Sequence, residues 1–395
     1  MDGVDDMCLL VFTRERRVLV LMTTLSIVNN NNGEKNLATE MKTWDEVRDR
    51  ATLLHTVRKP YDHRTPVARY MYGREENESY IQRLGGAILA GEVSQNNFSV
   101  TSHAESQLMS KIRYPRQLLG RLPNNNVIVD VNWLMQHGVE ADKNAFFRFI
   151  MNPQTERHVL RSVHGSAYQP IDDMDLLMHI DEYLKGAQVV YDGFGEHSTH
   201  LTAIWPDNPI PGGLVPGIHV ANSEVGLRSI SLGAVLYRES CGNILPGYYD
   251  SEVKDAMQYE GGNTIKARLN RKGYSGNMSN QWRFRHTGKE ERLIEWIKLA
   301  MDDLTIQWDT TIAKWNAGLR KLVEDPLEAI AAVSRRASLT QEQLQAALES
   351  WAETKHDFGS CSTGIANTFT LGAQQFTNPE HRYGMQHAGS LALST

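Results

Sequence analysis

Cysteine is scarce in this chain, which has only Cys8, Cys241 and Cys361 among its 395 residues. The three are odd in number and far apart, so a disulfide framework is excluded, and no pair has the spacing of a metal-binding motif. This usage favours a reducing compartment, and we expect the protein in the cytoplasm.

The motifs of several common enzyme classes are also missing. The chain has no Gly-x-x-x-x-Gly-Lys loop for phosphates and no Gly-x-Ser-x-Gly elbow for a nucleophile. Gly193-x-Gly195 lacks the third glycine of a dinucleotide site. We therefore assign no catalytic residue, no metal ligand and no cofactor. A role other than catalysis is favoured, and the sequence leaves open whether the chain is an enzyme.

Long apolar runs are absent as well. The run Val18–Val28 follows three arginines, but it is too short to span a bilayer. It is followed by Asn29–Asn32 and not by a small-residue cleavage site. We expect a buried strand or a covered sheet edge here, and no membrane partner.

The remaining patterns predict an α+β fold, with a central mostly antiparallel sheet, N-terminal helices and a C-terminal helical bundle. Four regions are expected: an arm and Asn-rich linker over 1–42, a helical N-terminal region over 43–186, a central β-rich region over 187–288, and a C-terminal helical region over 289–395.

Individual elements follow from capping boxes and periodicity. Capping boxes at Thr43-x-x-Glu46 and Thr340-x-x-Gln343 start two helices. Alternating residues predict a hairpin over 188–191 and 199–205, followed by strands over 217–222 and 230–239. We expect a loop over 58–75 and helices over 76–89, 98–123, 293–322 and 365–376.

Charge is unevenly distributed. The formal net charge is −6, yet residues 266–292 hold eight Lys/Arg and two Glu, a local balance of +6. The rest of the chain carries −12. A basic segment in an acidic chain is the one stretch where a polyanion would be clearly attracted.

This basic segment also carries aromatic residues, which is typical of single-stranded nucleic-acid binding. Cations neutralise phosphates, and each aromatic face can stack a base for about 1–3 kcal/mol. The predicted nucleic-acid-binding residues are Lys266, Arg268, Arg271, Lys272, Tyr274, Arg283 and Arg285. Trp282-Arg-Phe-Arg285 alternates as a strand would, so Trp282 and Phe284 could equally be core residues behind a solvated arginine face.

A second constellation surrounds His197-Ser-Thr-His200. Asp192 and Glu196 precede or flank this turn, and His219 and Glu224 follow it. Imidazole and carboxylate groups in one turn could hold zinc or a hard divalent ion. However, two histidines at this spacing lie on opposite faces if the second is in a strand. The alternative interpretation is a set of polar loop residues.

Several stretches in order resemble one family. They are Phe98–Leu108 with Tyr114-Pro115 and Leu122-Pro123, Leu160–Asp172 with Asp175-Leu-Leu, Pro216–Gly226 with Leu236–Asn243, Arg285–Gly288, and Gly364–Phe369. Together they span about residues 95–376 and resemble the phage/plasmid-like proteins, a family of unknown function found in phages, prophages and plasmids. The resemblance implies a mobile-element origin and a place in the host-cell cytoplasm, and it implies no reaction. Asn222, Glu224, Gly226 and Asn243 are expected to form turn and sheet architecture.

The leading hypothesis is a nucleic-acid-binding protein of phage-type DNA metabolism. It would bind without sequence preference, in a single-strand-binding or annealing role. One alternative is an oligomeric structural or assembly protein built on the helix over 293–322, which holds Trp296, Trp308 and Trp315. A second alternative is a metal-dependent nuclease or hydrolase using the His197–His200 turn. We expect a homo-oligomer.

Overall fold

The computed structural model describes residues 41–58, 60–75, 78–84, 97–152, 155, 157–195, 197–209, 214–239, 242–246, 282–286, 289–302 and 304–393. The chain divides into two compact units, Met1–Thr39 and Glu40–Thr395. All described residues belong to the second unit, so the predicted apolar run and all of the predicted arm before residue 41 lie outside the described residues.

Sheet A is the central sheet, and every pairing in it is antiparallel. Its strands lie in the order β1 (Lys42–Thr43), β8 (Gln188–Phe194), β9 (Thr199–Ile204), β10 (Leu214–Asn222), β11 (Ile230–Arg238) and β12 (Asn243–Pro246), with β13 (Trp282–Phe284) also on β11. The hairpin and the two strands predicted after it are confirmed. β10 is buried along its whole length, because side chains cover both faces of the sheet at this strand.

The strands β12 and β13 are two collinear halves of one edge strand. Pro246 at the end of β12 pairs with Val235, and Trp282 at the start of β13 pairs with Leu232. Both halves run antiparallel to β11, and only two β11 residues separate their pairing positions. Residues 247–281 are therefore an insertion into an edge strand of sheet A.

Sheet B is formed by a continuous part of the chain that lies between β1 and β8. Its order is β2 (Tyr61–Pro66), β6 (Asn144–Asn152), β7 (Arg157–Gly165), β5 (Asn97–Val100), β4 (Glu78–Arg83) and β3 (Tyr70–Glu75). All pairings are antiparallel except the one between β5 and β7. The helices α3 (Ser102–Ile112) and α4 (Asn124–His137) pack on this sheet through Leu108, Val127 and Val131.

Three helices bury an apolar face of sheet A. They are α2 (Trp44–Arg58), α5 (Asp173–Ile180) and α8 (Glu290–Asp302). Trp44, Leu176 and Ile297 from these helices share one core with Ile218 and other strand residues. The predicted capping box of α2 is present, because Thr43 N donates to Glu46 Oε2 at 2.7 Å and Glu46 N donates back to Thr43 Oγ1 at 3.3 Å.

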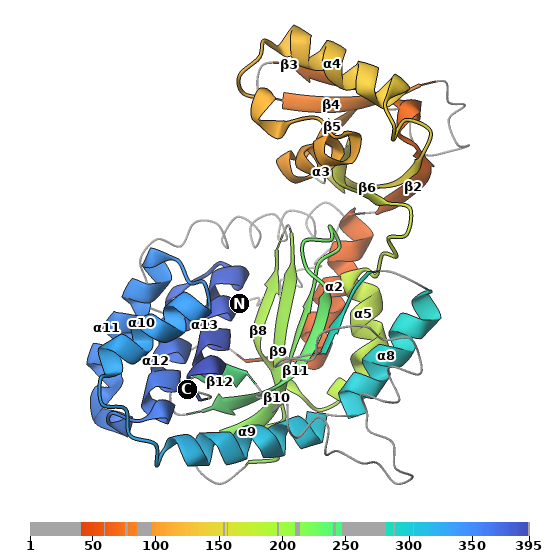
Figure 1. Ribbon diagram of the computed structural model, residues 1–395. Coiled ribbons are helices and arrows are strands. Elements are labelled where there is room, and N and C mark those ends of the chain that lie inside the picture. Colours follow the sequence, from red (N-terminus) through yellow and green to blue (C-terminus); the bar gives the residue numbers. More distant parts are fainter. Residues whose placement is uncertain are drawn as a thin grey trace, which may run out of the picture. The chain divides into compact units, whose positions relative to one another are not determined.

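The C-terminal region is helical, as predicted. It contains α9 (Leu304–Gly318), α10 (Pro326–Arg336), α11 (Gln341–Phe358), α12 (Ser362–Gly372) and α13 (Pro379–Ala392), and Figure 1 shows α10 to α13 gathered as one blue group. The capping box at Thr340 and Gln343 is confirmed. No helix in the described part of the chain is both long and apolar enough to cross a membrane.

The prediction of a helical region over 43–186 was incomplete, because all six strands of sheet B lie there. The segment predicted as a loop over 58–75 contains the strands β2 and β3. Its prolines do not interrupt β2, because Pro60 precedes the strand and Pro66 is its last residue. The helix predicted over 76–89 was wrong in its described part. That part is β4, in which Ser79 and Ile81 are buried in alternation between β3 and β5.

Candidate functional site

The predicted nucleic-acid-binding residues fall into two groups. Lys266, Arg268, Arg271, Lys272 and Tyr274 lie outside the described residues. Arg283 and Arg285 are described and are exposed. The predicted strand is present as β13, with Trp282 and Phe284 only 1% and 0% exposed in the core of sheet A. These two aromatics therefore pack against α8 and its neighbours and are not faces for bases.

Arg283 and Arg336 both act electrostatically on one histidine, His387. Burial first, and then the charges of Arg283 and Arg336, lower the pKa of His387 on α13 to about 4. Arg336 ends α10 and is exposed. The charges of two arginines from distant parts of the chain thus act on the same histidine.

The histidine turn does not bring together the imidazole and carboxylate groups that the metal interpretation would need. His200 and His219 are buried and meet through Nδ1 and Nε2 at 3.2 Å, and Nε2 of His200 is 3.2 Å from Glu380 Oε1. His197 is exposed, while Asp192 is paired with Lys42 and Arg50. Within the described ranges, no three His, Cys, Asp or Glu side chains form a metal-binding group.

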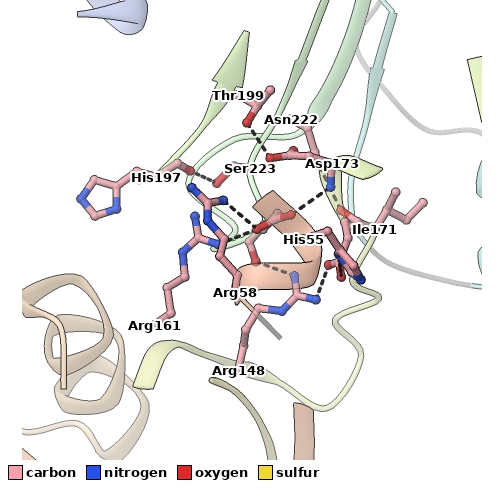
Figure 2. Close-up of polar contacts among 12 residues, drawn as sticks. His55, Arg58, Arg148, Arg161, Ile171, Asp173, His197, Thr199, Asn222 and Ser223 are labelled. Atoms are coloured by element: carbon pink, nitrogen blue, oxygen red, sulfur yellow. Dashed lines mark hydrogen bonds and ion pairs between the residues drawn. The ribbon is translucent and has the colours of Figure 1, made fainter. Parts of the chain in front are cut away.

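A different constellation forms a buried charge network, and Figure 2 shows its members Arg58, Arg148, Arg161 and Asp173 with their neighbours. It combines four carboxyl groups and three guanidinium groups from both sheets, α2 and α5. Its members are Arg58, Asp62, Arg148, Arg161, Asp172, Asp173 and Glu224. Buried charges of this density must be paired or neutralised, because desolvation of each ion costs several kcal/mol.

Arg148 of β6 connects three elements. Its side chain is 2% exposed, and it pairs with Asp62 of β2 at 3.0 Å and with Asp172, the residue before α5. Its Nη1 also donates to the backbone carbonyl of Glu224 at 3.1 Å. Burial raises the pKa of Asp172 in spite of the opposing charge of Arg148. One arginine thus ties sheet B to α5 and to the turn between β10 and β11.

Glu224 lies in that turn and is held ionised. Its Oε2 accepts from Arg161 of β7 at 2.5 Å and lies 3.9 Å from Arg58 Nη1 of α2. Burial alone would raise its pKa, but Arg161, Arg148 and Arg58 outweigh burial and lower the pKa to about 2. Glu224 is therefore an anion at any physiological pH.

Asp173, the first residue of α5, has the opposite character. Its Oδ2 accepts from Thr199 Oγ1 at 2.5 Å, and its Oδ1 accepts from Asn222 Nδ2 at 2.8 Å. Both donors are neutral. Burial first, and then the charge of Glu224, raise the pKa of Asp173 to about 7. Two neighbouring carboxyl groups therefore differ strongly in proton affinity, which is a common feature of functional sites.

A small pocket of about 10 Å³, the space of about one water molecule, lies beside these two carboxyl groups. Asp173 and Glu224 line it together with His55 and Arg58 of α2, and its remaining wall is mainly apolar. The apolar lining residues are Ala51, Leu54, Pro60, Ile150, Met174 and Phe194. Perturbed carboxyl groups that line a pocket make this network the candidate functional site of the described chain.

Gly226 closes the turn that carries Glu224. Its φ of +72° is in the left-handed region, and a Cβ at this position would lie 2.4 Å from His164 Cε1 of β7. The backbone of Asn222, Glu224 and Gly226 forms the end of β10 and the turn after it, as expected. The sequence did not predict that the side chains of Asn222 and Glu224 take part in the charge network.

This network cannot be recognised from the sequence, because its members are far apart in the chain and each has an ordinary local explanation. Asp172 and Asp173 stand at the start of a helix, where acidic residues commonly occur as caps, and Asp172 is the N-cap residue but makes no side-chain capping bond. Arg148 gave the clearest signal, because a charge inside the apolar run Ala145–Ile150 requires a buried partner. The sequence does not show which carboxylates pair with Arg148.

Comparisons with family models, with curated proteins and with solved structures found no match.

Proposed function

We propose that this chain is a nucleic-acid-binding protein of mobile-element DNA metabolism that binds single strands without sequence preference. The binding surface is the insertion after β12 together with β13, with Lys266, Arg268, Arg271, Lys272, Arg283 and Arg285 at phosphates and Tyr274 against a base. The mobile-element origin rests on the motif resemblance alone.

One observation carries the proposal: the basic insertion returns to sheet A at a strand that exposes its arginines. Trp282 and Phe284 anchor β13 in the core, so Arg283 and Arg285 are presented outward from a rigid element. Rigid presentation lowers the side-chain ordering cost of binding a flexible polyanion. We include Arg336 of α10 in the proposed surface, because its charge acts on the same histidine as the charge of Arg283.

The first experiment measures binding of a fluorescent single-stranded oligonucleotide by anisotropy at several salt concentrations. The double variant Arg283→Ala plus Arg285→Ala should lose about tenfold or more in affinity at low salt. Its slope of log K against log salt should fall by about 0.7 for each phosphate contact removed. Absence of binding by the unchanged chain at low salt would end the proposal.

Arg335→Ala is the matched control. Arg335 is next to Arg336 and is exposed, but it pairs with Glu328 at 2.7 Å on the same helix. Its removal should leave affinity almost unchanged, whereas Arg336→Ala should weaken binding. Equal losses in the two variants would mean that binding depends only on net charge and not on this surface.

A second experiment tests the insertion itself. A chain in which Thr-Thr replaces residues 247–281 should keep the register of β12 and β13, because two β11 residues separate their pairing positions. We expect cooperative unfolding like that of the full chain and loss of most oligonucleotide affinity. A folded variant that binds as well as the full chain would remove the insertion from the surface.

The homo-oligomer and the assembly role remain predictions. Trp296 and Trp315 are buried in the chain's own cores, and Trp308 Nε1 donates to the Gly217 carbonyl at 2.7 Å. These tryptophans therefore do not favour an assembly surface. Light scattering of the purified chain measures the oligomeric state directly.

The metal-dependent nuclease also remains a prediction, and no particular observation favours it. Assays of oligonucleotide cleavage with added magnesium or manganese would test it.

A further inference from the structure

Two buried histidines of sheet A belong to a hydrogen-bonded chain that ends at α13. Nδ1 of His200 lies 3.2 Å from Nε2 of His219, and Nδ1 of His219 lies 2.9 Å from Thr202 Oγ1. At the other end, Nε2 of His200 lies 3.2 Å from Glu380 Oε1. His200 and Thr202 are 0% exposed and His219 is 1% exposed. These four residues, the imidazole chain, join a helix carboxylate to a hydroxyl group inside the sheet.

The carboxylate at one end fixes the position of every proton in the imidazole chain. The pKa of Glu380 is lowered to about 2, so its carboxylate only accepts, and Nε2 of His200 carries a proton. A neutral imidazole has a single N–H. Nδ1 of His200 is therefore an acceptor, and Nε2–H of His219 donates to it. Nδ1 of His219 is then an acceptor as well, and the Thr202 hydroxyl donates to it.

The same four groups have a second complete arrangement, which holds one more proton. An added proton on Nδ1 of His200 would face the Nε2–H of His219. This conflict disappears when His219 carries its own proton on Nδ1, because Nε2 of His219 then accepts from His200. The Thr202 hydroxyl both donates and accepts, so it accepts from Nδ1–H of His219. Every contact of the imidazole chain is kept, and its two inner hydrogen bonds reverse direction.

From this geometry we propose that the imidazole chain is a buried proton-binding site that keeps α13 attached to sheet A in acid. One proton comes from solvent, the charge of the chain rises by one, and no other group changes. Nε2–H of His200 donates to Glu380 in both states, and in the second state this hydrogen bond joins two opposite charges. The site does not depend on the nucleic-acid surface proposed above.

The groups that face the two rings decide which ring becomes charged. They are Glu380, Arg382 and Tyr383 of α13 and Arg228 of the turn after β10. Burial lowers the pKa of His200, the hydrogen bond to Glu380 opposes this shift, and the charge of Arg228 adds to it. Burial, and then the charge of His200, hold the pKa of His219 well below its usual value. His200 therefore takes the extra proton, since it is the ring that contacts Glu380.

The first test is nitrogen NMR of the full chain with isotope-labelled histidine, from about pH 8 to about pH 4. The variants His200→Gln and His219→Gln assign the two rings. At the alkaline end we expect both rings to be neutral with the proton on Nε2. In acid, His200 should become doubly protonated while His219 changes to the neutral Nδ1–H form. A proton that stays on Nε2 of His219 after His200 is charged would overturn the proposal, as would two neutral rings down to the pH of unfolding.

The matched variants are Glu380→Gln and Glu353→Gln. Glu380→Gln keeps an acceptor for His200 but removes the negative charge, so the pKa of His200 should fall by about one unit or more. Glu353 is exposed on α11, and its replacement should leave the titration of both rings unchanged. An unchanged pKa of His200 in Glu380→Gln would contradict the assignment of the extra proton.

The attachment of α13 is measured separately by hydrogen exchange of the unchanged chain. Protection of the amides of Pro379–Ala392, corrected for the intrinsic exchange rate at each pH, should change less than about threefold while His200 takes up its proton. In Glu380→Gln the same amides should lose protection by about tenfold or more over this pH range. Loss of protection in the unchanged chain together with the titration of His200 would mean that the proton releases α13, and the proposal would be wrong.

Discussion

The backbone N–H of Asp173 donates a hydrogen bond of 2.9 Å to the Glu224 carboxylate. The Glu224 carboxyl group is ionised, because its pKa is lowered to about 2. The Asp173 carboxyl group favours its neutral form, because its pKa is raised to about 7. The backbone N–H at the start of α5 thus stabilises the ionised form of Glu224. The negative charge of Glu224 in turn contributes to the raised pKa of Asp173.

Asp173 and Glu224 should contribute to the free energy of unfolding with opposite pH dependences. The pKa of Asp173 is raised from 3.8 to about 7, so its contribution is complete below pH 3.8 and is lost as pH rises to about 7. The variant Asp173→Asn has no such proton to lose. Its free energy of unfolding relative to the unchanged chain should therefore rise by about 2–4 kcal/mol between pH 4 and pH 8. Urea unfolding at each pH measures the difference, and a constant difference would contradict the assignment.

Replacement of Glu224 by Gln should be strongly destabilising, because it leaves Arg161 and Arg58 without their anion. Removal of one partner from a buried pair costs about 3–5 kcal/mol. The pKa of Glu224 is lowered from 4.5 to about 2, so its contribution is present above pH 4.5 and is lost as pH falls to about 2. The loss in the variant should accordingly be largest at neutral pH. Glu182→Gln is the control, since Glu182 is 87% exposed and its removal should cost under about 1 kcal/mol.

Gly226→Ala should destabilise the turn that presents Glu224. The left-handed φ and the contact with His164 together predict a loss of about 2–4 kcal/mol by urea unfolding. Gly120→Ala is the matched control, because an added Cβ there has no atom within 4 Å, and it should change stability by less than about 0.5 kcal/mol. Equal effects of the two substitutions would mean that the turn is not constrained as described.

Buried histidines should make the fold sensitive to acid. His164, His200, His219, His286 and His387 all have a pKa lowered by burial. Each is neutral when folded and takes a proton on unfolding below pH 6.5, so stability should fall as pH drops from 6.5. Five such groups outweigh the opposite trend of the two carboxyl groups with a raised pKa, Asp172 and Asp173.

His387→Gln should flatten that pH dependence. Each histidine contributes up to about 1.4 kcal/mol per pH unit, and this share should disappear between pH 6 and pH 5 in the variant. The exposed His137 gives the control variant His137→Gln, whose unfolding curve should follow the unchanged chain. A slope that is the same in all three chains would exclude His387 as a contributor.

The parts of the fold that could be predicted from the sequence have local signals. Thr340 and Gln343 form their capping box from side chains three residues apart, and the hairpin of β8 and β9 is marked by alternation and a turn. β4 has a period-2 pattern as well, but it is short and polar, and its neighbours in the sheet decide its conformation.

The candidate site could not be predicted in the same way, because it is made by pairing across long separations. Asp173 and Asn222 meet over 49 positions, and Arg148 and Glu224 over 76. The exposure of the β13 arginines could be predicted, because aromatic residues and arginines alternate between neighbouring positions of Trp282–Arg285.

The placement of sheet B within the chain has a consequence for protein synthesis. Its six described strands all fall between Tyr61 and Gly165, while β1 and its partner β8 lie on either side of that stretch. A ribosome therefore releases a complete sheet B before it has made any later strand of sheet A. During that interval α2 has none of α5, β8 or β9 to cover its apolar face, so the nascent chain carries an exposed hydrophobic helix until about 40 further residues emerge.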